Sequence, residues 1–386
     1  MKTIIVEGIF RVLQRTGLTL FLLCLFFSHN QLLLKAENVS VEENMMEIDL
    51  TKNNQNTLQR YLDYLSLGLI GFSEDEKFKE ILYKEIQKRF DDDYNVLINT
   101  LIEACKINGI DLIQEMENYI YLNYQEKIDF NSILNKCKIK GLYPQIYIPI
   151  FEVIEKNRLT IDSLSGGNPV ILADRVSKSK NPFYQGKHFN RKNMRTEDLM
   201  VNEEYAQNNE VWVVAFNERV DGNGKPKKMG VKKPMRFNEY QGNMSGARQI
   251  NLSKIRCPDL SALESWTRGG PELWLVVFDK NKAEFSKQYF HMRRAEIANV
   301  WYNVNRWIGY WDYATSGDAL YFSWYEEDGG SNTQTITFTF TPIKGGPSIG
   351  VSFKIGSADD PAGGQTVNSD YYDAPYNTGL IEWRLY

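Results

Sequence analysis

Residues 321–330 read YFSWYEEDGG and show two features that recur through the carboxy-terminal half of this 386-residue chain. The first five residues are mostly aromatic, which is typical of a buried strand. Three carboxylates, Glu326, Glu327 and Asp328, follow directly, and two glycines then indicate a turn. The stretch therefore predicts a strand that ends in an acidic loop.

Further strands of this kind are expected on both sides of the stretch. Residues 334–341 read QTITFTFT and place Ile336, Phe338 and Phe340 on one face with threonines on the other. The other strands that we expect here are 272–278, 319–325, 348–355 and 380–386. Short strands separated by turns are typical of an antiparallel β-sandwich, which we place over residues 262–386.

The amino-terminal half has a helical pattern instead. Leu58, Leu62, Leu65 and Leu69 recur at steps of three or four residues. A capping box from Ser73 to Glu76 is expected to begin the next helix, and residues 91–93 (DDD) a third. The sequence thus predicts an α+β multidomain protein, with a small helical bundle over 50–160 that precedes the sandwich. A β-rich middle region over 165–255 connects the two, with strands expected at 169–174 and 210–216.

The first 36 residues resemble a leader. Lys2, Arg11 and Arg15 precede the apolar run 18–27 (LTLFLLCLFF), which is short for a membrane span. Residues 1–36 therefore predict a signal peptide and export to the periplasm, the cell surface or the medium. An uncleaved amino-terminal anchor and a lipoprotein modified at Cys24 are the alternatives.

Composition excludes several classes of protein. A net charge of −4 argues against a general nucleic-acid binder, because such proteins carry a strongly basic face. Beyond the leader only Cys105, Cys137 and Cys257 remain, too few for a disulfide framework. His188 and His291 are the two histidines outside the leader, and no HExxH pair indicates a zinc protease.

Acidic residues follow several expected strands and form the first candidate site. The metal ligands that we expect are Glu327, Asp328, Asp359, Asp360 and Asp370. Carboxylate oxygens without histidine suit Ca²⁺, which takes six to eight oxygens in flexible geometry. Asp312 and Asp318 precede the strand that Glu327 follows, so not all of these acids share one end of a sheet. The alternative is that they are solvated turn residues.

A resemblance supports the same reading. The order WD, GD, WYEEDGGS, TITFTF, DD and YNTGLIEW resembles the carboxy-terminal region of a family of secreted Bacteroidetes-type bacterial proteins, which also carry a segment similar to residues 90–97 (FDDDYNVL). This resemblance covers most of the mature chain. Residues 262–386 are similar in outline to eight-stranded sandwiches that bind calcium and phospholipid. That second resemblance implies Ca²⁺ and association with a membrane surface, although aspartates would be expected where Glu326 and Glu327 stand.

Aromatic residues form a second candidate site. Trp307, Trp311 and Tyr372 are expected to bind a ligand, such as a glycan stacked on the rings; the alternative is that they belong to the sandwich core. A basic stripe is a third candidate, for a phosphate-rich surface or merely a solvated arm: Lys225, Lys227, Lys228, Lys232, Lys233 and Arg236.

These patterns favour an exported, non-enzymatic protein. Its sandwich loops are expected to bind a ligand, a glycan or a protein, with help from Ca²⁺ and without nucleic acid. One alternative is a secreted hydrolase that cleaves glycans with a carboxylate pair such as Asp359 and Asp360. The other is a purely structural envelope protein.

Overall fold

The computed structural model describes residues 54–157, 168–175, 182–190, 192–193, 195–227, 247–328, 333–356, 359–372 and 374–386. Residues 1–36, where a signal peptide is predicted, and the basic residues from Lys228 to Arg236 lie outside the described residues. Contacts group residues 58–386 into one compact unit. The boundaries at 50–160, 165–255 and 262–386 stay a prediction.

Helices dominate the first hundred described residues, as the leucine spacing predicts. They are α2 (Asn54–Leu69), α3 (Glu76–Ile86), α4 (Ile98–Ile107), α5 (Leu112–Tyr124), α6 (Phe130–Ile139) and α7 (Ile150–Asn157), followed later by α8 (Glu203–Asn208), α9 (Arg294–Ile297) and α10 (Tyr313–Ser316). Asp75 caps α3 by accepting a hydrogen bond from the Phe78 amide at 3.0 Å. The predicted capping box from Ser73 is therefore wrong by two residues.

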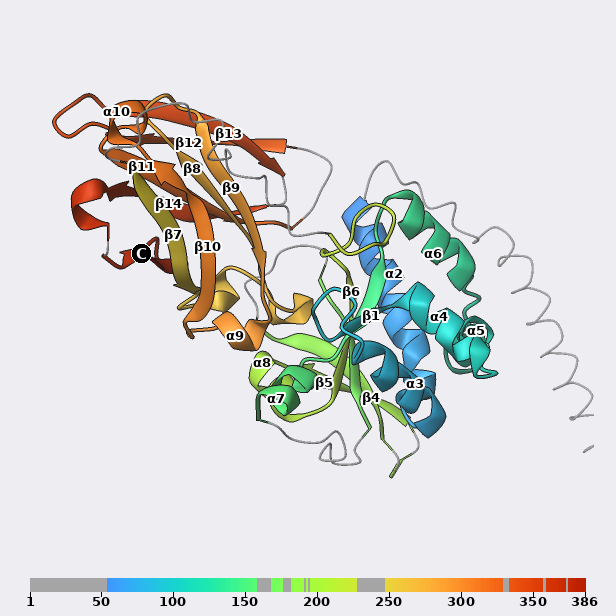
Figure 1. Ribbon diagram of the computed structural model, residues 1–386. Helices are drawn as coiled ribbons and strands as arrows, with labels where there is room; N and C mark the ends of the chain where they lie inside the picture. Colours follow the sequence, from blue (N-terminus) through green and yellow to red (C-terminus); the bar gives the residue numbers. More distant parts are fainter. Residues whose placement is uncertain are drawn as a thin grey trace, which may run out of the picture. The chain divides into compact units, whose positions relative to one another are not determined.

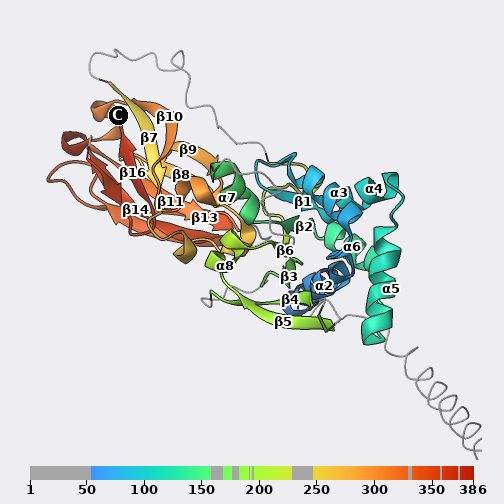
Figure 2. The same ribbon diagram turned by 90° about the horizontal axis from the view of Figure 1, so that it is seen from below.

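These helices surround a six-stranded sheet in the order β1-β2-β6-β3-β4-β5. Its strands are β1 (Asn95–Leu97), β2 (Pro144–Tyr147), β3 (Val170–Ala173), β4 (Tyr184–Asn190), β5 (Arg195–Val201) and β6 (Val211–Phe216). All neighbours are antiparallel except β3 and β6. Helices α3–α6 lie on one side of this sheet and α7 and α8 on the other (Figure 1, Figure 2).

The mixture of helices and antiparallel sheets is confirmed, but the helical bundle over 50–160 is not separate. β1 and β2 come from that region and pair with each other, and β2 continues the pairing to β6. The physical reason is that residues 95–97 and 144–147 are buried on every side, so their backbone groups need partners from other strands.

Two four-stranded antiparallel sheets follow, in the orders β10-β7-β16-β15 and β14-β11-β8-β9. The strands are β7 (Arg248–Arg256), β8 (Glu272–Phe278), β9 (Glu284–His291), β10 (Tyr302–Trp311), β11 (Ala319–Glu326), β14 (Asp360–Asn368), β15 (Tyr376–Asn377) and β16 (Glu382–Leu385). β8, β11 and β16 confirm the strands that the sequence predicts at 272–278, 319–325 and 380–386.

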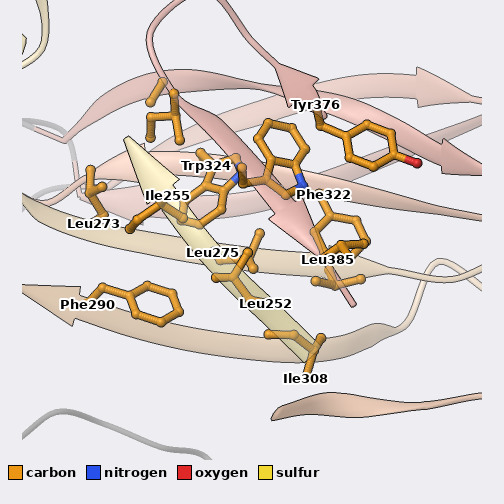
Figure 3. Packing of buried hydrophobic residues seen from close by; sticks show 14 of the residues in the cluster. Leu252, Ile255, Leu273, Leu275, Phe290, Ile308, Phe322, Trp324, Tyr376 and Leu385 are labelled. Carbon is orange, nitrogen blue, oxygen red and sulfur yellow. The ribbon is translucent and has the colours of Figure 1, made fainter. Parts of the chain in front are cut away.

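One hydrophobic core joins the inner faces of these two sheets. Ile255 and Leu252 of β7 belong to the same buried cluster as Leu275 of β8 and Trp324 of β11. Figure 3 shows these side chains turned toward one another between the strands. Trp324 and Trp383 pack with ring centroids 5.7 Å apart, so large aromatic rings fill much of the space between the sheets.

A two-stranded ribbon covers the other face of the β8–β11 sheet. It consists of β12 (Thr333–Phe340) and β13 (Ile349–Gly356), paired along their whole length. Phe338 stacks on Tyr321 of β11 with centroids 3.8 Å apart, while Thr335 and Thr337 are exposed. The alternation expected for residues 334–341 is confirmed.

The shared core generates a stability prediction. Leu275 is fully buried there, so Leu275→Ala should lower the free energy of unfolding by about 2–5 kcal/mol in urea titrations. Thr335→Ala, on the exposed face of β12, should change it by less than about 0.5 kcal/mol. Equal effects of the two substitutions would contradict the shared core.

Candidate functional site

Arg219 connects the first sheet to the strands that follow it. It lies just after β6, and its side chain is almost fully buried. Nε donates to Glu272 at the start of β8, and Nη1 lies 3.4 Å from a carboxylate oxygen of Asp93. Nη2 donates to the carbonyls of Gly270 at 2.9 Å and Met292 at 3.2 Å. One guanidinium thus contacts four groups from three separate segments, which contain Asp93, residues 270–272 and Met292.

The Asp-rich stretch before β1 is a turn, and the predicted helix start at residues 91–93 is wrong. Asp92 has φ +71°, which a helix does not allow. Asp91 and Asp93 point inward, and Asp91 accepts hydrogen bonds from the side-chain amides of Asn217 at 2.7 Å and Asn95 at 3.1 Å. The buried carboxylates are held by partners that are distant in sequence, which local helix rules cannot reveal.

Two glycines let the chain pass close to this turn. A Cβ on Gly269 would lie 2.2 Å from an oxygen of Asp93, and one on Gly270 would lie 1.9 Å from the carbonyl oxygen of Met292. Gly269 also has φ +96°, which favours glycine. The close approach brings Glu272 within reach of Arg219.

Arg268, one residue earlier in the same loop, gathers a second set of acids. Its Nη1 donates to Glu218 at 3.1 Å and to Asp328 at 2.7 Å, and its Nε to Asp174 at 3.2 Å. Asp174 also accepts a hydrogen bond from the Thr267 hydroxyl. These acids follow β6, β11 and β3. Arg268 therefore connects strand ends of the six-stranded sheet with a strand end of the β14-β11-β8-β9 sheet.

A carboxylate oxygen of Glu264 lies 4.0 Å from the Nε of Arg268, and Glu326 lies beside Glu264. Both are buried, and within the described residues the Oε2 atom of each has no hydrogen-bond partner. One carboxylate oxygen from each of Glu264, Glu326 and Asp328 lies within 4.8 Å of the others. Glu264 belongs to a second such group with Glu218 and Glu272.

We call the full set the carboxylate cluster. It consists of Asp93, Asp174, Glu218, Glu264, Glu272, Glu326 and Asp328, with Arg219 and Arg268. Acids exceed arginines in a region with little water, so full ionisation would leave a large uncompensated negative charge.

Burial shifts the titration of this cluster accordingly. Desolvation raises the pKa of Glu264 to about 7 and that of Glu272 to about 8, against the opposing pull of the neighbouring arginines. Burial also raises the pKa values of Glu218 and Glu326 well above their usual range. The charge of Arg268 opposes this rise at Glu218, whereas the neighbouring Glu264 adds to it at Glu326. At neutral pH the cluster therefore holds protons unless another cation replaces them.

Of the five predicted metal ligands, only Asp328 belongs to the carboxylate cluster. Glu327 pairs with Lys227 at 2.9 Å and accepts a hydrogen bond from the Trp274 indole, also at 2.9 Å. Asp359 accepts hydrogen bonds from the backbone amides of Gly356 at 2.6 Å and Asp328 at 3.3 Å.

The two remaining predicted ligands lie on other elements. Asp360 begins β14 opposite Glu326. Asp370 is exposed and pairs with Lys344, whose amide donates to Asp318 near the opposite end of β11. The structure therefore separates Asp370 from Asp328, and the prediction that these two acids share a metal ion is wrong.

Two of the three predicted aromatic ligands are core residues. Trp311 is fully buried and donates its indole N–H to the Gly317 carbonyl at 2.8 Å. Tyr372 is buried, and its hydroxyl donates to the carbonyl of Tyr386. Neither ring offers a face to a ligand, because each fills space between the sheets. Trp307 is partly exposed.

Sequence reasoning missed Glu218, Glu264 and Glu272, together with both arginines. Glu272 does carry a signal, since it begins the otherwise apolar stretch ELWLVVF. A carboxylate next to such a strand is expected to need a buried partner. The partner itself could not be identified, because Arg219 lies 53 residues away.

Comparisons with family models, with curated proteins and with solved structures found no match for this chain. Among the described residues, no helix is long and apolar enough to cross a membrane. The site must therefore be interpreted from its own chemistry.

Arg219 provides a direct test of the network. Arg219→Met should lower the free energy of unfolding by about 3–5 kcal/mol, because Asp93 and Glu272 lose their buried cation. The Arg219→Met/Glu272→Gln variant should recover part of this loss in the same urea titration. Arg195→Met removes an exposed arginine and should leave the transition unchanged. An unchanged Arg219→Met transition would contradict the network.

A buried acid outside the cluster predicts how stability depends on pH. Glu152 accepts hydrogen bonds from the Tyr147 hydroxyl at 2.5 Å and the Ala295 amide at 2.9 Å, yet burial raises its pKa from 4.5 to about 7. The folded state thus holds a proton that the unfolded state releases near pH 4.5. This stabilisation is complete below that pH and is lost as the pH rises through about 7.

Wild type should therefore lose roughly 2–3 kcal/mol of stability through Glu152 between pH 5 and 8. Glu152→Gln has no such proton to lose, so its stability should fall by that much less over the same range. Urea titrations at several pH values measure the difference. Parallel pH profiles of the two proteins would show that Glu152 is already ionised in the folded state.

Proposed function

We propose that this protein is an exported, non-enzymatic binding protein in which a bound Ca²⁺ ion stabilises the carboxylate cluster. The helices and the six-stranded sheet form its amino-terminal part, and the two four-stranded sheets act as a β-sandwich that carries the ligand. The leader at residues 1–36 supports export, and the partner is a glycan, another ligand or a protein.

The unpartnered Oε2 atoms of Glu264 and Glu326 carry the calcium part of this proposal. They are buried, they lie in a cluster with more acids than arginines, and no described group donates to them. A carboxylate in such a place takes up either a proton or a metal ion. A divalent cation would remove the excess charge and use the free oxygens at the same time.

The ligand chemistry favours Ca²⁺ over the other divalent ions. Glu264, Glu326 and Asp328 offer carboxylate oxygens and no nitrogen or sulfur, which suits a hard cation. Ca²⁺ accepts carboxylates in one- or two-oxygen modes and tolerates irregular geometry. Mg²⁺ prefers to keep several waters, for which a buried site leaves less room.

The same burial disfavours the hydrolase alternative. A glycosidase needs two carboxyl groups that face each other across a sugar, roughly 5–10 Å apart. Glu264 and Glu326 have oxygens within 4.8 Å of each other, but both side chains are buried beneath strands and loops. A sugar could reach them only if the loops around Arg268 opened.

Thermal unfolding with calcium and with a chelator tests the proposal. At a Ca²⁺ concentration a hundred times the dissociation constant, wild type should gain roughly 2.7 kcal/mol of stability over the protein in EDTA. The gain arises because only the folded state assembles Glu264, Glu326 and Asp328. Calcium binding at pH 7 should also release protons, which an unbuffered titration detects.

Glu326→Gln should lose this calcium-dependent gain, since one charged ligand is removed. Glu152→Gln is the matched control, because it neutralises an equally buried acid outside the cluster and should keep the full gain. If calcium leaves wild type unchanged, or stabilises Glu326→Gln as much as wild type, the cluster holds protons and not a metal ion.

A further inference from the structure

The outer face of the sheet β10-β7-β16-β15 carries basic, amide and aromatic side chains. Ile250, Leu252 and Ile255 of β7 point into the shared core. Asn251 and Lys254, which lie between them, are only partly buried and are not part of that core, and the pairing of the strands shows which residues lie beside them. Lys254 lies opposite both Asn303 of β10 and Arg384 of β16.

Three cations surround one indole ring on this outer face. The side-chain nitrogen of Lys254 lies 5.1 Å from the centre of the Trp301 ring, and the guanidinium carbons of Arg256 and Arg384 lie 4.9 and 5.6 Å from it. Arg256 pairs with Glu382 at 2.5 Å. Neither Lys254 nor Arg384 forms an ion pair within the described residues, although the chain as a whole carries a net negative charge.

Aromatic and amide side chains continue this surface along β10. Asn251 lies opposite Trp307, and Gln249 lies opposite Tyr310. Trp307 and Tyr310 contact each other edge to face with centroids 5.5 Å apart, and both are partly exposed. From residue 301 to residue 310 the surface extends roughly 25–30 Å at the usual rise of a strand.

From this arrangement we infer that the outer face of the β10-β7-β16-β15 sheet binds an acidic polysaccharide, with carboxylate or sulfate groups at Lys254 and Arg384 and sugar rings against Trp301 and Trp307. The inference rests on the proposed binding function in that it names the ligand class. The C–H face of a sugar packs on an aromatic ring, and its hydroxyls match side-chain amides such as those of Asn251 and Asn303. The length of the surface suits a linear polymer better than a single small ligand.

Charge and shape favour this partner over two other anionic ones. A nucleic acid presents a phosphate at each nucleotide and binds through many cations, whereas Lys254 and Arg384 are the two cations on this face for which the described part of the chain supplies no acidic partner. A membrane surface is held by clusters of basic residues together with projecting apolar side chains. Here the rings lie among exposed amides and cations, such as Gln249, Asn303 and Arg384.

Binding of the full-length protein to hyaluronan, a linear polymer with a carboxylate on every second sugar, tests the inference. Wild type should bind hyaluronan and not neutral dextran, in EDTA as well as in calcium. Lys254→Gln/Arg384→Gln should weaken binding by about tenfold or more, because both unpaired cations are lost. Trp301→Ala should weaken it to a similar degree through the lost stacking. Lys187→Gln, which removes a partly exposed lysine from β4, is the control and should bind like wild type.

Several outcomes would overturn the inference. These are equal binding to dextran, unchanged binding by Lys254→Gln/Arg384→Gln with an unchanged melting temperature, or binding only to a dT oligonucleotide or to vesicles containing phosphatidylserine. The calcium proposal is judged separately, since Glu326→Gln should lose calcium stabilisation but still bind hyaluronan. A protein that binds hyaluronan without responding to calcium would therefore leave this inference intact and disprove the calcium site.

Discussion

The cost of removing carboxylates from water is the constraint on which the interior of this protein depends. An isolated buried carboxylate is so unfavourable that it must be paired, protonated or bound to a metal ion. Arg219 and Arg268 each satisfy several acids at once, and they do so with groups from loops that are far apart in sequence. The loops meet at one place because each supplies a charge that would otherwise be unpaired.

The strand register explains why so many acids come together there. β8 and β11 are antiparallel neighbours, and Glu326 lies opposite Leu273, next to Glu272. The backbone amide of Glu272 donates to the carboxylate of Glu326 at 3.3 Å. The acidic end of β11 therefore faces the acidic start of β8. Because the segment with Glu218 and Arg219 covers this end, carboxylates that would otherwise be solvated become buried.

The sheet that contains β7 separates two kinds of chemistry. On its inner face, Ile250, Leu252 and Ile255 contribute to an aromatic core that excludes water. On its outer face, Lys254 and Arg256 are partly exposed beside Trp301. Alternation of side chains along β7, interrupted beside Ser253 where the pairing with β10 and β16 shifts, produces this contrast within nine residues. The buried carboxylate cluster and an anion-binding outer face would be physically independent.

Local pattern by itself determined the strands with regular alternation or a continuous apolar run, such as residues 334–341 and 272–278, and the leucine-rich helices. It missed β10, whose register is shifted by bulges, and β14, which contains Pro361 and adjacent glycines. It also identified Glu326–Asp328 as an acidic strand end. Only the tertiary structure decided that Glu326 and Asp328 are buried beside Glu264 and Arg268, while Asp370 remains in solvent. The reason is that burial and charge compensation are properties of contacts between distant segments, and spacing along the chain does not encode which loops meet.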